Sequence, residues 1–165
     1  MAQGRQGRPR QKSEYGQRLE EKQNLKGEYG LREKQFSNYF KKGTDSASIF
    51  GLLESRLDSV LYRSGFAPTR GAARQMASHG HAIVNGRRVT IPSYQLRTGD
   101  KVNVREGSYG SGLFADYDMR MKKFEPPSWL VLDKKAREIT IKGIPDMREQ
   151  AQPFNFQTVI EFYSR

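Results

Sequence analysis

The chain has 165 residues, and its 29 lysine and arginine residues against 18 aspartate and glutamate residues give a formal net charge of +11. This charge favours a polyanionic partner, and nucleic acid fits better than a membrane because no run of about 18 apolar residues is present. There is no cysteine, and His79 and His81 are the only histidines, which excludes disulfides, thiolate metal sites, cysteine nucleophiles and histidine-rich metal sites. We therefore expect no cofactor and no bound metal.

The positive charge is concentrated in the first two thirds of the chain. The net charge is +6 over residues 1–42, +4 over residues 43–107 and +1 over residues 108–165. Residues 59–99 contain six arginines and both histidines without one aspartate or glutamate. We expect the anionic partner to lie against this first part of the chain. The N-terminus lacks the apolar core of a secretory signal, so we expect the protein to stay in the compartment that makes it.

Residues 1–12 are rich in glycine, glutamine and arginine and have almost no apolar side chain. Such a segment cannot bury enough surface to offset the cost of ordering itself, so we predict a flexible basic arm in the free protein. The arm is either a solubilising tail or a segment that orders on a partner.

Residues 13–54 are predicted to form a helical domain. Ser13 is a suitable N-cap for a first helix, and Gly27 and Gly30 are expected to interrupt that helix. A second helix is expected over residues 31–42, with Phe36 and Tyr39 on one apolar stripe. At this spacing core packing is the favoured role of these aromatic side chains, and stacking on nucleic-acid bases is the alternative.

The best helical pattern in the chain runs from about residue 46 to residue 63. Apolar side chains recur there every three or four residues for about four turns, with Ser46 or Ser48 as the cap. Arg56 and Arg63 lie off the apolar face. We predict one continuous helix that Gly65 ends with a left-handed conformation.

A short basic helix and a tight hairpin are predicted next. Thr69 is placed to cap the helix, and Gly80 to end it. Asn85 followed by Gly86 between apolar runs indicates a two-residue type I′ turn. Alternation over residues 101–105 predicts a half-buried strand, so residues 55–106 should form a small antiparallel sheet with two packed helices. The outward side chains of the helix and hairpin are Arg70, Arg74, Gln75, Ser78, Arg87 and Arg88.

The remaining third should extend this second domain and complete the first. We predict a flexible joint at residues 107–112, a short helix over residues 113–123, and two strands around a charged turn at residues 133–137, with Trp129 as a packing residue. The apolar stripe of residues 156–163 suits a helix, although a strand is the alternative. Residues 107–149 are then a linker, short helix and β-hairpin, and residues 150–165 complete the helical domain. The predicted fold class is α+β.

Residues 55–89 resemble the S4-type RNA-binding module, through Arg56 and the runs 62–66, 69–75, 78–81 and 84–89. Residues 14–36 and the ending at residues 159–165 also resemble the universal S4 family of small-subunit ribosomal proteins. The resemblance covers residues 14–165. The chain begins at the equivalent of a basic stretch that follows an N-terminal extension in bacterial members. Its residues 107–124 are poor in the helix formers expected there.

The resemblance implies a structural constituent of the small ribosomal subunit with no enzymatic activity, in a cytoplasmic bacterial or an organellar ribosome. Such a protein binds the 5′ domain of small-subunit ribosomal RNA early in assembly and lines the mRNA entry region, beside proteins of the uS5 and uS3 types. No membrane contact and no homo-oligomer are expected. The alternatives are a stress protein that uses the module in ribosome rescue, and a fragment of an RNA-modifying enzyme. The length after Arg105 leaves no room for a catalytic domain.

We expect arginine and lysine to neutralise phosphates, and Gln75, Ser78, His79 and Asn85 to add hydrogen bonds to phosphate or ribose, while RNA shape gives most of the selectivity. On this basic surface we expect Asp58 to orient an arginine such as Arg63 or Arg70, the alternative being an exposed helix residue. The candidate RNA-binding residues of the module are Arg56, Arg63, Thr69, Arg70, Arg74, Gln75, Ser78, His79, Asn85, Arg87 and Arg88. Those of the helical domain are Tyr15, Arg18, Lys22, Lys26 and Arg32.

Overall fold

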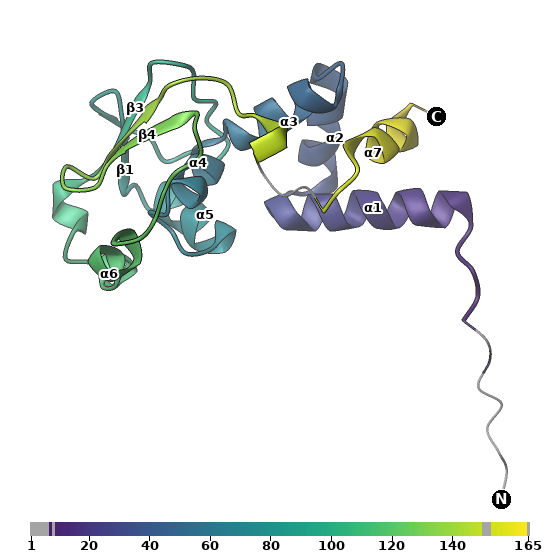
Figure 1. Cartoon of the computed structure of the whole chain (residues 1–165), viewed down its shortest axis with the longest axis horizontal. Helices are drawn as coiled ribbons and strands as arrows, with labels where there is room; N and C mark the ends of the chain where they lie inside the picture. Colours follow the sequence, from purple (N-terminus) through teal and green to yellow (C-terminus); the bar gives the residue numbers. More distant parts are fainter. Residues whose placement is uncertain (1–6, 8, 150–152, 165) are drawn as a thin grey trace, which may run out of the picture.

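The computed structural model describes residue 7, residues 9–149 and residues 153–164. Most of the arm predicted over residues 1–12 lies outside the described residues, as do residues 150–152 and 165 of the C-terminal segment. The described chain forms two packed units side by side, one made only of helices and one built on a sheet (Figure 1). We call them the helical unit (α1, α2, α3 and α7) and the sheet unit (α4 to α6 and the strands). The predicted α+β fold class is confirmed.

The helical unit begins with α1 (Glu14–Tyr29), which Ser13 caps by accepting a hydrogen bond from the Gly16 backbone N–H. The helix ends at Gly30 in a left-handed conformation with φ 65°. The predicted interruption at Gly27 is wrong, because α1 continues through it. A single glycine inside a helix costs only about 1 kcal/mol, which the packing of α1 can offset.

The core of the helical unit is aromatic and aliphatic. It joins α1 to α2 (Glu33–Lys42), α3 (Ser46–Glu54) and α7 (Phe156–Tyr163), and buries Phe36, Phe50, Leu53, Phe156 and Val159 completely or almost so. The core role predicted for the stripe on α2 is confirmed. The C-terminal segment is a helix, and it lies along α1 although the two are at opposite ends of the sequence (Figure 1).

The continuous helix predicted up to residue 63 is wrong, because the chain breaks it into α3 and α4 (Leu57–Arg63). Arg56, the residue before α4, has extended backbone angles (φ −65°, ψ 147°) and forms an isolated β-bridge with Gln95. The backbone N–H of Leu57 donates to the Tyr94 carbonyl at 2.9 Å. The apolar period alone could not show this break, because the compensating hydrogen bonds come from residues 92–96. The cap of α3 is Asp45, with Ser48 completing the capping box.

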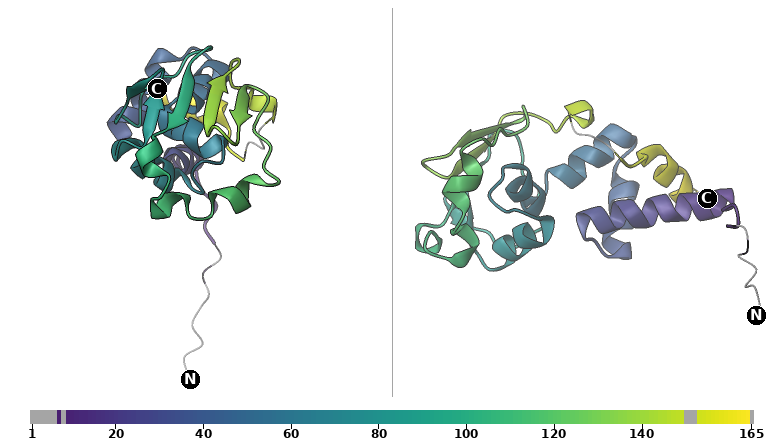
Figure 2. Two further views of the ribbon diagram at one scale, coloured as in Figure 1. Left: turned by 90° about the vertical axis from the view of Figure 1, so that its left-hand side faces the viewer. Right: turned by 60° about the horizontal axis from the view of Figure 1, so that its bottom comes forward.

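The sheet is antiparallel and has the strand order β2-β1-β3-β5-β4. Its strands are β1 (Ala82–Val84), β2 (Arg87–Arg88), β3 (Lys101–Val104), β4 (Leu130–Asp133) and β5 (Glu138–Ile141). The strands form one layer with helices behind it (Figure 2). Those helices are α4 and α5 (Arg70–Ser78), which share one apolar core with the sheet. Alternation along β3, with Val102 and Val104 buried and Lys101 exposed, confirms the predicted strand.

Residues 106–121 contain three short helical turns, where a flexible joint (residues 107–112) and one short helix (residues 113–123) were predicted. These are η1 (Glu106–Ser108), η2 (Gly112–Phe114) and α6 (Tyr117–Met121), and a further turn, η3 (Met147–Glu149), follows β5. Phe114, Tyr117, Met121 and Trp129 are buried in the core of the sheet unit, so the packing role predicted for Trp129 is confirmed. Within the described ranges, no helix has the length and apolar character needed to span a bilayer.

Candidate nucleic-acid interface

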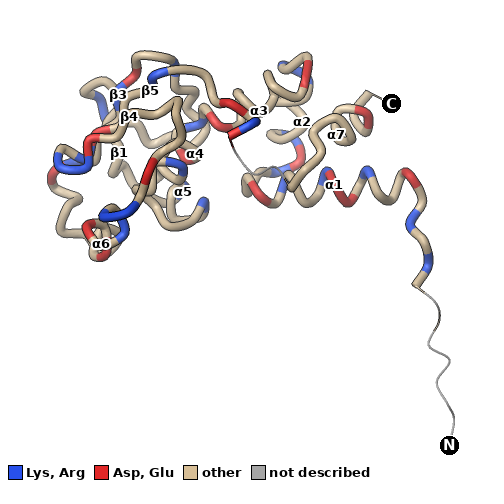
Figure 3. The backbone as a smooth tube through the Cα atoms, viewed as in Figure 1, with Lys and Arg blue, Asp and Glu red and all other residues tan. Residues whose placement is uncertain are grey.

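The exposed face of α5 and the β1-β2 hairpin carries much of the predicted RNA-binding set. Thr69 caps α5 by accepting from the Ala72 backbone N–H at 3.0 Å, and Gly80 follows the helix with φ 75°. Both predictions for the ends of this helix are confirmed. Basic positions also lie on the helical unit, so both units carry them (Figure 3). The exposed predicted residues of this region are Thr69, Arg74, Gln75, Ser78, His79, Asn85, Arg87 and Arg88.

The hairpin tip is the predicted type I′ turn, since Asn85 and Gly86 both have positive φ (49° and 81°). The Asn85 side chain holds this tip against β3. Its amide nitrogen donates to Asp100 at 3.0 Å, and its oxygen accepts from the Lys101 backbone N–H at 2.9 Å. Asn85 therefore positions Arg87 beside the turn, and its own polar atoms are already used within the protein.

Arg88 lies across the end of α5. Its Nε donates to the Gly80 carbonyl at 3.0 Å, and its Nη2 donates to the His79 carbonyl at 3.2 Å. These bonds satisfy carbonyls at the helix C-terminus, where a positive charge is also favourable. They hold the guanidinium in place and leave Arg88 without a carboxylate partner among the described residues.

Replacing Gly80 with alanine is expected to lower the free energy of unfolding by about 1 to 3 kcal/mol. The left-handed conformation is strained for alanine, and the new Cβ would collide with the Arg88 guanidinium. Urea unfolding measures the change. Gly143→Ala is the matched control, because its added Cβ meets open space, and we expect a change within about 0.5 kcal/mol. Equal effects of the two substitutions would contradict this account of Gly80.

Arg56 was predicted to contact RNA, but the structure places it in the interior. It is 1% exposed. Its Nε and Nη2 donate to the two Asp58 carboxylate oxygens at 3.0 and 2.9 Å, and its Nη1 donates to the Tyr39 hydroxyl at 2.8 Å. With its donors satisfied internally, Arg56 links the break before α4 to α2. Asp58 does orient an arginine, but that arginine is Arg56 and not Arg63 or Arg70.

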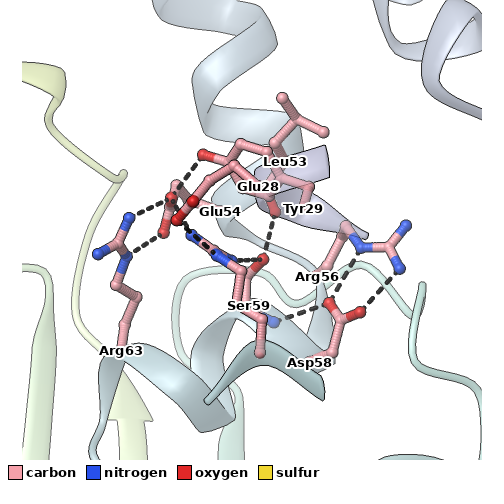
Figure 4. Close-up of polar contacts among 9 residues, drawn as sticks. Glu28, Tyr29, Leu53, Glu54, Arg56, Asp58, Ser59 and Arg63 are labelled. Atoms are coloured by element: carbon pink, nitrogen blue, oxygen red, sulfur yellow. Dashed lines mark hydrogen bonds and ion pairs between the residues drawn. The ribbon is translucent and has the colours of Figure 1, made fainter. Parts of the chain in front are cut away.

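Glu54, the last residue of α3, is a buried carboxylate at the junction of the two units (Figure 4). It is 1% exposed, and Arg63 binds it through two nitrogens at 2.8 and 2.9 Å. Arg70 donates to it at 3.2 Å, and the Tyr29 hydroxyl donates to it at 2.7 Å. Arg63 and Arg70 were predicted to bind RNA, but the structure pairs both with this carboxylate. Both are mostly buried and neutralise Glu54.

The two arginines also decide the ionisation of Glu54. Burial by itself would raise the pKa of Glu54, but the hydrogen bond and charge of Arg63, with the charge of Arg70, outweigh it and lower the pKa below its usual value of 4.5. Burial and the neighbouring Glu54 raise the pKa of Tyr29 well above 10.0, so Tyr29 stays a neutral donor. Glu54 and Tyr29 were not among the predicted site residues. For Glu54, the only local sign of a buried carboxylate was its position directly after the apolar pair Leu52 and Leu53.

The sequence was compared with protein families and with known proteins. A family model described as ribosomal protein S4/S9 N-terminal domain matches residues 1–61, and the S4 domain model matches residues 55–102. The small ribosomal subunit protein uS4 of Thermus thermophilus is 47% identical over 165 residues, covering 97% of this chain and 79% of that protein. The chain belongs to the uS4 family.

Two further uS4 proteins are similar to this chain over nearly its whole length. The protein of Brevibacillus brevis is 44% identical over 161 residues (94% of this chain and 80% of that protein), and the protein of Chlorobium limicola is 42% identical over 158 residues (93% and 78%). The S4 domain match begins at residue 55, where the chain breaks between α3 and α4. The suspected relationship to the uS4 family is therefore confirmed.

On the helical unit of this uS4 family member, the predicted basic residues differ in availability. Lys22 is 6% exposed, with its Nζ 2.7 Å from Glu33 and over the Phe162 ring. Its predicted RNA contact is corrected to a structural role. Lys26 shares Glu33 at 3.3 Å, and Arg18 lies 3.7 Å from Glu161, so both are partly buried and paired. The exposed members of this predicted set are Tyr15 and Arg32.

Proposed function

We propose that this uS4 family chain is a structural constituent of the small ribosomal subunit that binds ribosomal RNA through the exposed surface of α5 and the β1-β2 hairpin. The observation that carries the proposal is the group Arg74, Arg87 and Arg88. All three are exposed, and none lies within ion-pair distance of a carboxylate among the described residues. Unpaired arginines on rigid elements suit phosphate groups at fixed spacing.

Arg32 and the partly available Arg18 and Lys26 extend this surface over the helical unit. Arg74 joins the two areas, because its Nη1 donates to the Gly30 carbonyl at the end of α1. An RNA fold that spans both units would therefore meet charges in a fixed arrangement. This supports recognition of RNA shape, with Gln75, Ser78 and His79 adding polar contacts. We propose that the role is structural and not catalytic.

The finer assignment is also a proposal, supported by family membership and the basic surface. It places the RNA site at the 5′ domain of small-subunit ribosomal RNA, and the partners at the mRNA entry region as proteins of the uS5 and uS3 types. We also propose that the two units are two domains. The first consists of residues 13–54 completed by residues 150–165, and the second of residues 55–106 extended by residues 107–149. Residues 1–12 then form a basic arm.

Binding of the full chain to a transcript of the 5′ domain tests this function. The comparison RNA is an unrelated transcript of equal length, and both are titrated over a series of salt concentrations with competitor RNA present. We expect the 5′ domain to bind much more tightly and to keep this preference in competitor. Equal affinities would contradict the assembly role and leave a basic RNA-binding protein.

A further inference from the structure

The Arg137 guanidinium lies against aromatic rings of the sheet unit. Arg137 lies in the turn between β4 and β5 with φ 50°. Its guanidinium carbon is 4.4 Å from the ring centroid of Tyr109 and 4.3 Å from that of Tyr117. Tyr117 is buried, and its hydroxyl donates to the Lys134 carbonyl at 3.1 Å. Arg137 has no carboxylate within ion-pair distance in the described chain, so the aromatic rings are its main contacts.

Tyr109 is the surface member of this cluster, with 37% exposure. The preceding residue, Ser108, is buried, and its Oγ lies 2.6 Å from His81 Nδ1. The following Gly110 adds no side chain next to Tyr109, and nothing lies within 4 Å of the position that a Cβ would take there. The segment was predicted to be a flexible joint. The structure instead holds Tyr109 between an anchored serine and a cationic support.

Two imidazole rings and two arginines lie near this anchor. The His79 and His81 rings follow α5 and are 6.4 Å apart, and the His79 carbonyl accepts a hydrogen bond from the Arg88 guanidinium. Burial, together with the charges of His79, Arg105 and Arg88, lowers the pKa of His81. Arg105 folds over Gly107 in the same turn. Neither Arg88, in β2, nor Arg105, which follows β3, forms an ion pair in the described chain, and both guanidinium groups lie close enough to His81 to act on its pKa. They are therefore available to an anion bound near Ser108 and Tyr109.

We propose that Tyr109, supported by Arg137, is a stacking site for an unpaired base of the bound RNA, with phosphates next to that base neutralised by Arg88 and Arg105. The inference rests on the proposed RNA binding and adds a residue outside the predicted set. Bases inside a duplex cannot offer a free face, so the ligand is a looped-out or single-stranded nucleotide. Stacking on a ring that is already positioned has a small entropic cost and tolerates any base.

The test compares Tyr109→Ala, Tyr109→Phe and Tyr94→Ala in the full chain, with two probes: a single-stranded RNA and a fully paired RNA duplex of equal length. Tyr94 is the matched control because it is 39% exposed and has no arginine against its ring among the described residues. Tyr109→Ala should weaken single-strand binding by roughly 5- to 100-fold and change duplex binding less than about twofold. Tyr109→Phe should bind like the unchanged chain, because its ring remains.

A second readout does not depend on affinity. With 5-iodouridine in the single strand, irradiation should cross-link Tyr109, and mass spectrometry identifies the residue. Unchanged single-strand affinity of Tyr109→Ala without a cross-link would overturn the inference, as would an equal loss from Tyr94→Ala. Thermal unfolding of each variant shows that the chain is folded. A lack of preference for the 5′ domain would contradict the proposed function alone, since the comparison of single strand with duplex does not depend on that RNA.

Discussion

Replacing Glu54 with alanine is expected to lower the free energy of unfolding by about 3 to 5 kcal/mol. The substitution leaves the mostly buried Arg63 and Arg70 without their shared carboxylate, and it removes the acceptor of the Tyr29 hydroxyl. An uncompensated buried charge is costly even where the intact pair contributes little net stability. Glu54 is in the helical unit and both arginines are in the sheet unit, so packing between the units should weaken as well.

Urea unfolding of the Glu54→Ala chain measures this loss. Glu28→Ala is the matched control, because Glu28 is 43% exposed and touches Arg70 at 3.5 Å. A partly exposed pair of this kind is worth about 1 kcal/mol or less. If the two substitutions had similar effects, Glu54 would not be the centre of the junction.

The same carboxylate gives a pH dependence with a defined sign. The folded pKa of Glu54 lies below its usual value of 4.5, so the unfolded chain binds a proton more readily. The contribution of Glu54 is therefore complete at neutral pH and is lost as the pH falls below about 4.5 and passes the folded pKa. Glu54→Gln removes this titration. The free energy of unfolding of the Glu54→Gln chain should therefore fall less steeply over the same acid range than that of the unchanged chain.

Substituting Arg74, Arg87 and Arg88 together with glutamine is expected to give the largest loss of RNA affinity. With about six to ten phosphate contacts, the unchanged chain should lose some three to five decades of affinity between 50 and 200 mM salt. Three fewer contacts lower the slope of log affinity against log salt by about 2 to 3, so the variant should lose roughly 1 to 2 decades less over that range. Binding titrations at several salt concentrations measure both slopes.

The control for this variant removes the same charge elsewhere. Lys122, Lys123 and Lys142 are exposed and outside the proposed surface, and none is in an ion pair within the described residues. Substituting these three with glutamine should change the slope by less than half as much. An equal change would mean that net charge, and not the face of α5 and the hairpin, determines binding.

Buried arginines hold together the two units that carry the proposed RNA-binding surface. Arg56, Arg63 and Arg70 all bind carboxylates or a tyrosine at the junction of the two units. Arg70 also lies 4.2 Å from the Tyr29 ring centroid, and so connects α5 to α1. The free arginines are therefore displayed on units that other arginines hold together. This supports a preorganised surface for RNA.

Several features of this chain followed from the sequence because they depend on neighbouring residues. The cap at Thr69, the turn at Asn85 and Gly86, and the apolar stripe of α2 each involve positions within one or two helical turns or one hairpin. The net charge and its location depend on composition alone. The family was also predicted from the sequence, because its motifs are runs of neighbouring residues that can be compared without a structure.

What the sequence could not predict depends on contacts between distant segments. The break before α4 exists because residues 92–96 supply hydrogen bonds to it, and the apolar period continues through it unchanged. Two arginines of the predicted RNA-binding set have different environments in the structure. Arg88 lies exposed over a helix end, while Arg63 neutralises a buried carboxylate. Sequence determined which side chains are charged. Only the tertiary structure decided which charges are satisfied inside the protein, because a carboxylate brought within 3 Å outweighs any local preference for solvent.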